Sequence, residues 1–213
     1  MSDVSFDPAC RRCERLAGFL DSSRTRYPDY HCAPVAPFGD DAARLNVVGL
    51  APGLHGANAT GRPFTGDHAG VILYETLHRF GFASSAQSVS RDDGLQLIGA
   101  RITNAVKCVP PANKPLPAEI AQCNGFLATE LAKAPADAVL VALGRIAHDA
   151  IVRALGLPLR GFPFAHEAEH ALGSLRLIDS YHCSRYNTQT RRLTPAMFDR
   201  VFARARALLE ARG

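Results

Sequence analysis

The chain has 213 residues, 47% of them hydrophobic, and a formal net charge of +4. This length suits one sizeable core, so we expect a single domain over residues 1–213 that functions as a monomer. The mild basic excess favours a phosphate-bearing partner without requiring one. The N-terminus has no apolar signal segment, and no stretch approaches the roughly 20 apolar residues that a membrane helix needs. We therefore expect a cytoplasmic protein with no membrane partner.

Four short apolar runs predict strands that are buried on both faces. Segments with helical spacing lie between them, at roughly 67–80, 117–133 and 145–155, and a last helix is expected to begin at Thr194 and Pro195. This alternation predicts an α/β fold with a four-stranded parallel sheet sandwiched between helices. The runs are 45–50 (LNVVGL), 101–107 (RITNAVK), 138–143 (AVLVAL) and 175–181 (LRLIDSY).

Ligands of parallel α/β sheets bind outside the carboxyl ends of the strands, so the loops that follow the strands are informative. The first such loop, GLAPGLHGANATGRPFTGD, is dense in glycine, which indicates close approach of the backbone to a ligand. The G-x-x-x-x-G-K-[ST] and G-x-G-x-x-G patterns are absent, which disfavours nucleoside triphosphates. An ordinary turn-rich surface loop remains the alternative. The polar, serine-rich stretch 82–96 is expected to lie on the surface, and we assign it no role.

Six cysteines in a chain without a secretion signal favour metal ligation over a disulfide framework. Cys10 and Cys13 form a C-x2-C pair, and Cys108 and Cys123 lie on either side of a loop and helix start. Four thiolates suit either an iron–sulfur cluster or one zinc ion, and the ligand type does not separate the two. Buried thiols without a metal are the third interpretation.

Two cysteines lie outside this pattern. Cys32 lies in a proline-rich stretch and is expected to have no function. Cys183 follows His182 and is expected to line a pocket without ligating a metal. The neighbouring imidazole keeps a nucleophilic thiol open as an alternative, because an adjacent base can lower the pKa of a thiol.

The motifs GLAPG, FTGD, TNAVKC and HCSRYN, in this order after successive predicted strands, resemble those of the uracil-DNA glycosylase superfamily, family 5 (UDGb), of the iron–sulfur type. The resemblance covers most of the chain. It implies a four-stranded parallel sheet between helices, and a monofunctional DNA N-glycosylase that flips out and hydrolytically removes uracil during base excision repair. It also implies a [4Fe–4S] cluster on Cys10, Cys13, Cys108 and Cys123.

Such chemistry must stabilise an oxocarbenium-like sugar and an anionic leaving base. His182, directly after the last strand, is expected to donate a hydrogen bond to O2 of the base. Asn104 is expected to pair with the edge of the extruded base, and Phe64 to stack on its ring. The alternatives are a surface histidine, a turn asparagine and a core phenylalanine.

Asp67 stands where a helix should begin, so its carboxylate can act as a cap. In the better-known uracil glycosylases the water-activating side chain lies in the first motif, and here Ala51 holds that place. The resemblance therefore assigns to Asp67 the positioning of water or stabilisation of the sugar cation. Gly56 replaces a glutamate that closes the pocket of family 4 enzymes, which predicts removal of hypoxanthine and xanthine as well. Gly49 and Gly53 complete the expected substrate loop.

The last loop is expected to bind DNA through phosphate contacts and a wedge that fills the space of the flipped nucleotide. A solvated basic loop would have a similar composition. The wider superfamily commonly has proline after the histidine, and Cys183 in that place is a departure that bears on the rigidity of the loop. The expected DNA-binding residues are Ser184, Arg185, Tyr186, Asn187 and Arg191.

Three functions remain open at this point. In the first, a glycosylase uses water and no lyase chemistry, because no lysine is suitably placed and Lys107 is expected to face phosphate or solvent. In the second, a non-catalytic nucleic-acid-binding module has the same fold, because Ala51 removes one polar catalytic position. A zinc- or thiol-dependent hydrolase is more distant, since four thiolates leave no open metal position for water.

Overall fold

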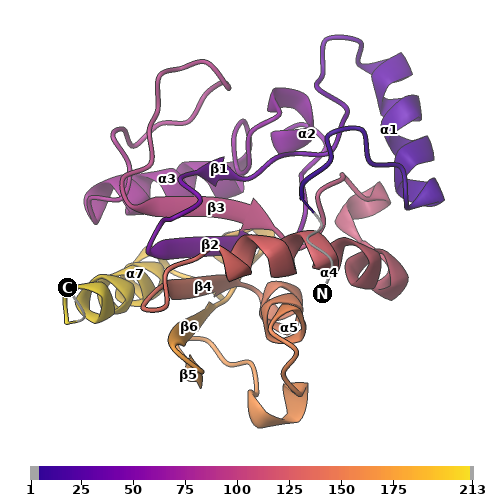
Figure 1. Cartoon of the computed structure of the whole chain (residues 1–213). Coiled ribbons are helices and arrows are strands. Elements are labelled where there is room, and N and C mark those ends of the chain that lie inside the picture. The colour runs from indigo at the N-terminus through magenta and orange to yellow at the C-terminus, as the bar shows by residue number, and fades with distance from the viewer. Residues whose placement is uncertain (1–4, 212–213) are drawn as a thin grey trace.

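The computed structural model describes residues 5–211, so both ends of the predicted 1–213 domain lie outside the described residues. One mixed sheet lies between two helical layers (Figure 1). The strand order is β1-β3-β2-β4-β6-β5, in which the four central strands are parallel and the two edge strands are antiparallel to their neighbours. The strands are β1 (Phe38–Gly39), β2 (Leu45–Gly49), β3 (Ala100–Asn104), β4 (Val139–Leu143), β5 (Glu169–Leu172) and β6 (Leu175–Ser180).

The α/β class and all four predicted strands are confirmed, but the sheet has six strands and not four. Both missed strands lie at the edges. β1 has only two residues, and β5 is partly exposed and short of apolar residues, so neither produces a buried apolar run. The predicted strand 101–107 ends at Asn104, where its pairing with β2 stops.

The four predicted helices are confirmed as α3, α4, α5 and α7, and their starts follow the expected caps. The Asp67 side chain accepts the N–H of Gly70, and the Thr194 side chain accepts that of Met197. Within the described residues, every helix is too short or too polar to traverse a bilayer. The helices are α1 (Glu14–Arg26), α2 (Ala57–Thr60), α3 (His68–Arg79), α4 (Pro117–Ala132), α5 (Arg145–Ala154), α6 (Arg185–Gln189) and α7 (Pro195–Glu210).

Alternate residues of the central strands supply two separate cores. Val47 and Val141 pack with α3 and α7 on one face, and Val48 and Leu140 pack with α4 and α5 on the other (Figure 1). The chain passes from β2 to β3 on one side and later to β4 on the other side of β2. The carboxyl ends of β2 and β4 therefore form a topological switch point, where a crevice opens.

The polar stretch 82–96 has a structural role that the sequence did not indicate. Arg62, in the glycine-rich loop, is 3% exposed and forms a two-point ion pair with Asp93 at 2.6 and 2.8 Å. Its guanidinium also donates to Ser88 Oγ at 2.7 Å and lies 5.0 Å from the centroid of the Phe38 ring. Hydrogen bonds from Arg62 lower the pKa of Asp93. This ion pair ties the stretch to the loop after β2.

We expect Asp93→Asn to reduce the free energy of unfolding by about 2 kcal/mol, because the buried guanidinium of Arg62 loses its charged partner. The pKa of Asp93 is lower in the folded chain, so its contribution is present above the ordinary value of 3.8 and is lost as the pH falls through the folded pKa. Urea denaturation measures the difference. Asp92→Asn is the matched control, and equal losses in both variants would contradict the expectation.

Candidate active site

A cavity of about 560 Å³ opens at the carboxyl ends of the central strands. Its walls come from four distant segments: the loop after β2 with the start of α3, the end of β3 with the segment after it, the turn after β4, and the loop after β6. The structure thus brings together most of the residues that the sequence analysis singled out. Those lining the cavity are Ala51, Gly53, Phe64, Asp67, Asn104, His182, Ser184 and Arg185.

Two residues that line this cavity each have a buried polar atom with no hydrogen-bond partner among residues 5–211, namely Asn104 Oδ1 and His182 Nδ1. A buried polar atom without a partner costs about 1–3 kcal/mol, so such atoms mark places where a ligand can complete the bond. Burial lowers the pKa of His182 to about 4. The imidazole is therefore neutral near pH 7 and carries one N–H donor.

Phe64 forms an aromatic wall beside His182, with ring centroids 6.0 Å apart and planes inclined by 27°. The φ of Phe64 is +53°, which bulky residues rarely adopt. Glycines make this conformation sterically possible. A Cβ on Gly49 would lie 2.5 Å from Phe64 Cζ and 2.4 Å from Asn104 Oδ1, and one on Gly70 would lie 1.8 Å from the Phe64 carbonyl oxygen. Gly49 therefore serves the site by letting the ring and the carboxamide approach each other.

The two oxygens of Asp67 have different surroundings. Oδ1 accepts the N–H of Gly70 at 2.9 Å and caps α3. Oδ2 faces the glycine-rich loop, where a Cβ on Gly53 or Gly56 would lie 3.1 or 2.4 Å from it. Burial raises the pKa of Asp67, while the backbone hydrogen bonds oppose that shift. Capping and a functional role are therefore compatible in one side chain.

Gly56 does not leave open space beside the cavity. The position that its side chain would take is occupied by the Asp67 carboxylate, whose Cγ would lie 2.8 Å from a Cβ there. Gly56 is also not among the residues that line the cavity. Glycine is needed at position 56 because any larger residue would overlap the Asp67 carboxylate.

The cavity also contains residues that the sequence analysis missed: His68, Asn113, Arg145 and Ile146. The Nε2 of His68 lies 3.0 Å from Thr188 Oγ1 and so joins α3 to α6. The arginine and isoleucine begin α5 directly after β4. Ligands bind at the carboxyl ends of parallel strands, and β4 is one of these strands. The same rule would therefore have predicted Arg145 and Ile146 from the sequence.

The loop after β6 is held in place without the usual proline. Cys183 is fully buried and donates to the Ala69 carbonyl at 3.5 Å, and Asn187 Nδ2 donates to the His182 carbonyl at 2.8 Å. Burial raises the pKa of the Cys183 thiol, and this residue does not line the cavity, which argues against a nucleophilic thiol. Tyr186 is 71% exposed. The exposed arginines near it are Arg185, Arg191 and Arg192.

The four cysteines expected as metal ligands line one small cavity between α1 and α4. An ion pair of 2.6 Å between Arg15 and Glu119 joins these two helices. The backbone N–H of Lys107 donates to Cys123 Sγ at 3.3 Å. Burial, together with the charge of the other sulfurs, raises the pKa of Cys108 to about 12, so thiolates at this place need a metal centre to balance their charge. The four residues are Cys10, Cys13, Cys108 and Cys123.

The expectation that Lys107 faces phosphate or solvent is wrong. The side chain is 1% exposed, and its Nζ donates to Thr103 Oγ1 at 2.6 Å, to the Asn104 carbonyl at 2.9 Å and to Glu130 Oε2 at 3.0 Å. A buried ammonium is stable only with such partners, and the sequence does not show that Glu130 of α4 would supply one. Lys107 therefore supports the backbone of Asn104 from beneath the cavity.

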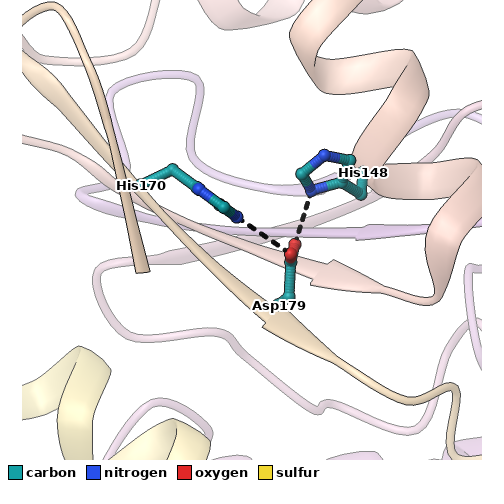
Figure 2. Close-up of side chains that lie close together, drawn as sticks. All are labelled: His148, His170 and Asp179. Atoms are coloured by element: carbon teal, nitrogen blue, oxygen red, sulfur yellow. Dashed lines mark hydrogen bonds and ion pairs between the residues drawn. The ribbon is translucent and has the colours of Figure 1, made fainter. Parts of the chain in front are cut away.

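Behind the turn after β4, two histidines flank one carboxylate (Figure 2). His148 of α5 has Nδ1 2.7 Å from Asp179 Oδ1, and His170 of β5 has Nε2 3.1 Å from Asp179 Oδ2. The other nitrogen of His148 lies 2.8 Å from the Phe162 carbonyl, so both ring nitrogens face acceptors, an arrangement that favours the cationic ring. Burial opposes this charge, but the hydrogen bond and charge of Asp179 raise the pKa of His148.

This histidine–carboxylate group joins α5, β5 and β6. Its carboxylate belongs to the end of β6, three residues before His182 in the chain. It is the one group among the described residues in which three or more ligating atoms all lie within 4.8 Å of one another. The 2.7 Å contact of His148 has the length of a charge-assisted hydrogen bond, and the 3.1 Å contact of His170 has that of an ordinary one. Hydrogen bonding therefore accounts for the arrangement without a metal. The group therefore fixes the turn at Gly144 relative to the end of β6.

We expect Asp179→Asn to destabilise the fold by about 3 kcal/mol near pH 6, because it leaves the buried imidazolium of His148 without its counter-charge. The folded pKa of His148 is raised, so this contribution is present below the ordinary value of 6.5 and is lost as the pH rises through the folded pKa. Denaturation of wild type and variant at pH 6 and pH 9 measures the difference. The exposed Asp29, changed to Asn, is the control. A deficit that does not shrink at pH 9 would contradict the ion pair.

Comparison with known proteins gives a consistent result. The family model described as the uracil DNA glycosylase superfamily matches residues 36–206. The chain is 46% identical over 206 residues to the type-5 uracil-DNA glycosylase of Thermus thermophilus, with 94% of each protein covered. It is 42% identical over 202 residues to that of Pyrobaculum aerophilum, covering 93% of this chain and 88% of the relative. The type-4 uracil-DNA glycosylase of Archaeoglobus fulgidus is 34% identical over 140 residues, covering 65% of this chain and 56% of the relative.

Proposed function

The chain belongs to the uracil DNA glycosylase superfamily, and we propose that it removes uracil from DNA by hydrolysing the N-glycosidic bond, as the first step of base excision repair. The observation that carries this proposal is the pair of unpartnered atoms, Asn104 Oδ1 and His182 Nδ1, beside the ring of Phe64 in one cavity. A flipped uracil offers ring N–H and carbonyl groups for both atoms and a flat face for the ring. We further propose that residues 1–213 act as one domain and as a monomer on DNA.

Base recognition is assigned to Asn104 and Phe64. The carboxamide oxygen accepts the N–H at N3 of uracil, and the aromatic ring stacks on the base. Neither side chain has to move far, because Gly49 permits their approach and Lys107 holds the Asn104 carbonyl. The site is thus preorganised for a planar base.

His182 acts on the leaving base. As the glycosidic bond breaks, negative charge collects on O2 of uracil, and an imidazole N–H directed at that atom stabilises it. With a pKa of about 4, the ring stays neutral at physiological pH and is available as a hydrogen-bond donor throughout.

Asp67 acts on the sugar. Its Oδ1 is held by the cap of α3, so the orientation of Oδ2 toward the loop after β2 is fixed. A carboxylate in this place stabilises the oxocarbenium-like sugar and orients the attacking water. Ala51, which also lines the cavity, offers no polar group for this task.

We extend the proposal to the larger deaminated bases hypoxanthine and xanthine. A cavity of about 560 Å³ is within the range of sites for drug-sized ligands and leaves room for a bicyclic base. Gly56 does not supply this room, since Asp67 fills the position of its side chain. Breadth of substrate therefore depends on the volume of the cavity.

We propose a [4Fe–4S] cluster on Cys10, Cys13, Cys108 and Cys123, with a single zinc ion as the alternative. One zinc ion with four bonds of about 2.3 Å would bring its sulfurs within about 4 Å of one another. The four thiols do not form a group with all sulfurs within 4.8 Å, as far as the described residues show, and this wider spacing supports a cluster. When bound, the group would crosslink the N-terminal segment to the segment that follows β3.

Substitution of Asp67 tests the proposed activity. We expect both Asp67→Ala and Asp67→Asn to slow uracil release by at least about 100-fold, because each removes the charge that stabilises the sugar cation. Asparagine can still cap α3, so only the alanine variant should also lose about 1 kcal/mol of stability. Single-turnover cleavage of oligonucleotides with uracil, hypoxanthine or xanthine, followed by alkali, measures the rates.

Each outcome of this assay bears on one alternative. An asparagine variant with wild-type rates would show that Asp67 is only a cap. A wild type that binds DNA but releases no base would favour the non-catalytic module. Release of uracil alone would contradict the broader substrate range.

Anaerobically purified protein is expected to contain about four iron atoms per chain and to absorb visible light as iron–sulfur proteins do. Cys123→Ser should lose the iron and lower the melting temperature, because the crosslink between α1 and α4 is lost. Cys32→Ser, at a buried cysteine outside the set, is the control and should keep the iron. One equivalent of zinc and no visible absorption would refute the cluster.

A further inference from the structure

A second cavity, of about 480 Å³, adjoins the proposed base pocket. The two cavities share Gly144, Arg145 and His182, so the turn after β4 and the end of β6 form a common wall. Among the described residues no carboxylate lines the second cavity. Its other lining residues are Phe164, Ala165, Tyr181, Asn187 and Arg192.

Aromatic rings position both arginines of this cavity. Arg145 Cζ lies 5.6 Å from the ring centroid of Phe164, and Arg192 Cζ lies 4.7 Å from that of Tyr181. Contact with a ring restrains a guanidinium and removes part of its hydration, but leaves the N–H groups at its edge free to donate. The rings are themselves held, since Tyr181 stacks on His166 with centroids 4.9 Å apart.

Neither of these arginines takes part in any ion pair found within residues 5–211. The arginines of the adjoining helix α7 behave differently. Arg200 and Arg204 form ion pairs with Glu167 and Glu169 at 2.6 and 2.8 Å. The second cavity thus holds two guanidinium charges that no carboxylate of the described residues neutralises. Planar guanidinium groups in such a setting suit the oxygens of a phosphate diester.

We propose that the second cavity binds a backbone phosphate of the DNA strand that carries the target base, through Arg145 and Arg192. This inference rests on the proposed function. A base bound in the first cavity stays joined to its own strand, and the second cavity is next to the first, so a phosphate of that strand is within reach. The arginines come from the turn after β4 and from the segment after α6. They therefore extend the DNA contacts of the last loop to a second element of the fold.

A binding measurement without bond cleavage tests this phosphate site. The double variant Arg145→Gln/Arg192→Gln is titrated with a labelled duplex containing a tetrahydrofuran abasic analogue, by fluorescence anisotropy at several salt concentrations. Each phosphate contact contributes about 0.9 to the slope of log affinity against log salt concentration, so the slope should fall by roughly one to two. Arg200→Gln/Arg204→Gln removes the same charge from ion-paired arginines and should leave the slope near the wild-type value.

A neutral phosphate locates the contact on the strand. One methylphosphonate is placed at each phosphate near the abasic analogue in turn. In the wild type, a methylphosphonate at one or two positions should weaken binding by about five-fold or more. In the double variant the same substitutions should have little effect, because the arginines that contact this phosphate are already absent. Arg145→Lys/Arg192→Lys keeps the charge without the planar fork and should bind with intermediate affinity.

Two results would overturn the phosphate site. One is a salt dependence of the glutamine double variant that equals that of the Arg200/Arg204 control. The other is a methylphosphonate effect that is the same in wild type and double variant at every position. Failure of the wild type to release uracil would instead refute the proposed function, and the binding data would stay interpretable on their own.

Discussion

The site depends on glycine at the end of β2, because the absence of a side chain there lets the side chains of neighbouring segments approach one another. Gly49 ends β2 in register with Asn104 of β3, and the missing Cβ lets the ring of Phe64 and the Asn104 carboxamide meet there. Gly56 does the same for the carboxylate of Asp67. A methyl group at either glycine would overlap atoms that the proposed chemistry needs. The density of glycine in this loop is therefore a steric requirement and not a sign of a mobile loop.

Buried polar groups of two kinds surround this site, and their energetic consequences are opposite. Lys107 and Asp179 lie in the interior with complete sets of partners, so they hold β3 and β6 in place at little net cost. Asn104 Oδ1 and His182 Nδ1 have no partner in the part of the chain that the structure describes, and each lies next to one of these supported segments. The fold thus stabilises the supports and leaves the incomplete hydrogen bonds where a base can supply them.

The distribution of ion pairs separates the scaffold from the proposed DNA-facing surface. Arg62, Arg200 and Arg204 are neutralised by carboxylates and connect parts of the fold. Arg145 and Arg192 lie against aromatic rings and have no such partner among the described residues, beside the loop of the exposed Tyr186. With a net charge of only +4, the proposed nucleic-acid-binding face depends on arginines that carboxylates do not neutralise.

The sequence by itself determined the α/β class, the four central strands and the four longer helices that cover them, because buried strands and capped amphipathic helices have local patterns. The order of the motifs likewise predicted which segments meet at the cavity. Only the tertiary structure decided that Asp67 fills the place left by Gly56, that Lys107 is buried, and that Arg145 shares a wall with His182. The edge strands β1 and β5 also emerged only there. These features are contacts between segments distant in the chain, and such contacts are set by packing and partner geometry, which leave no periodic signal along the sequence.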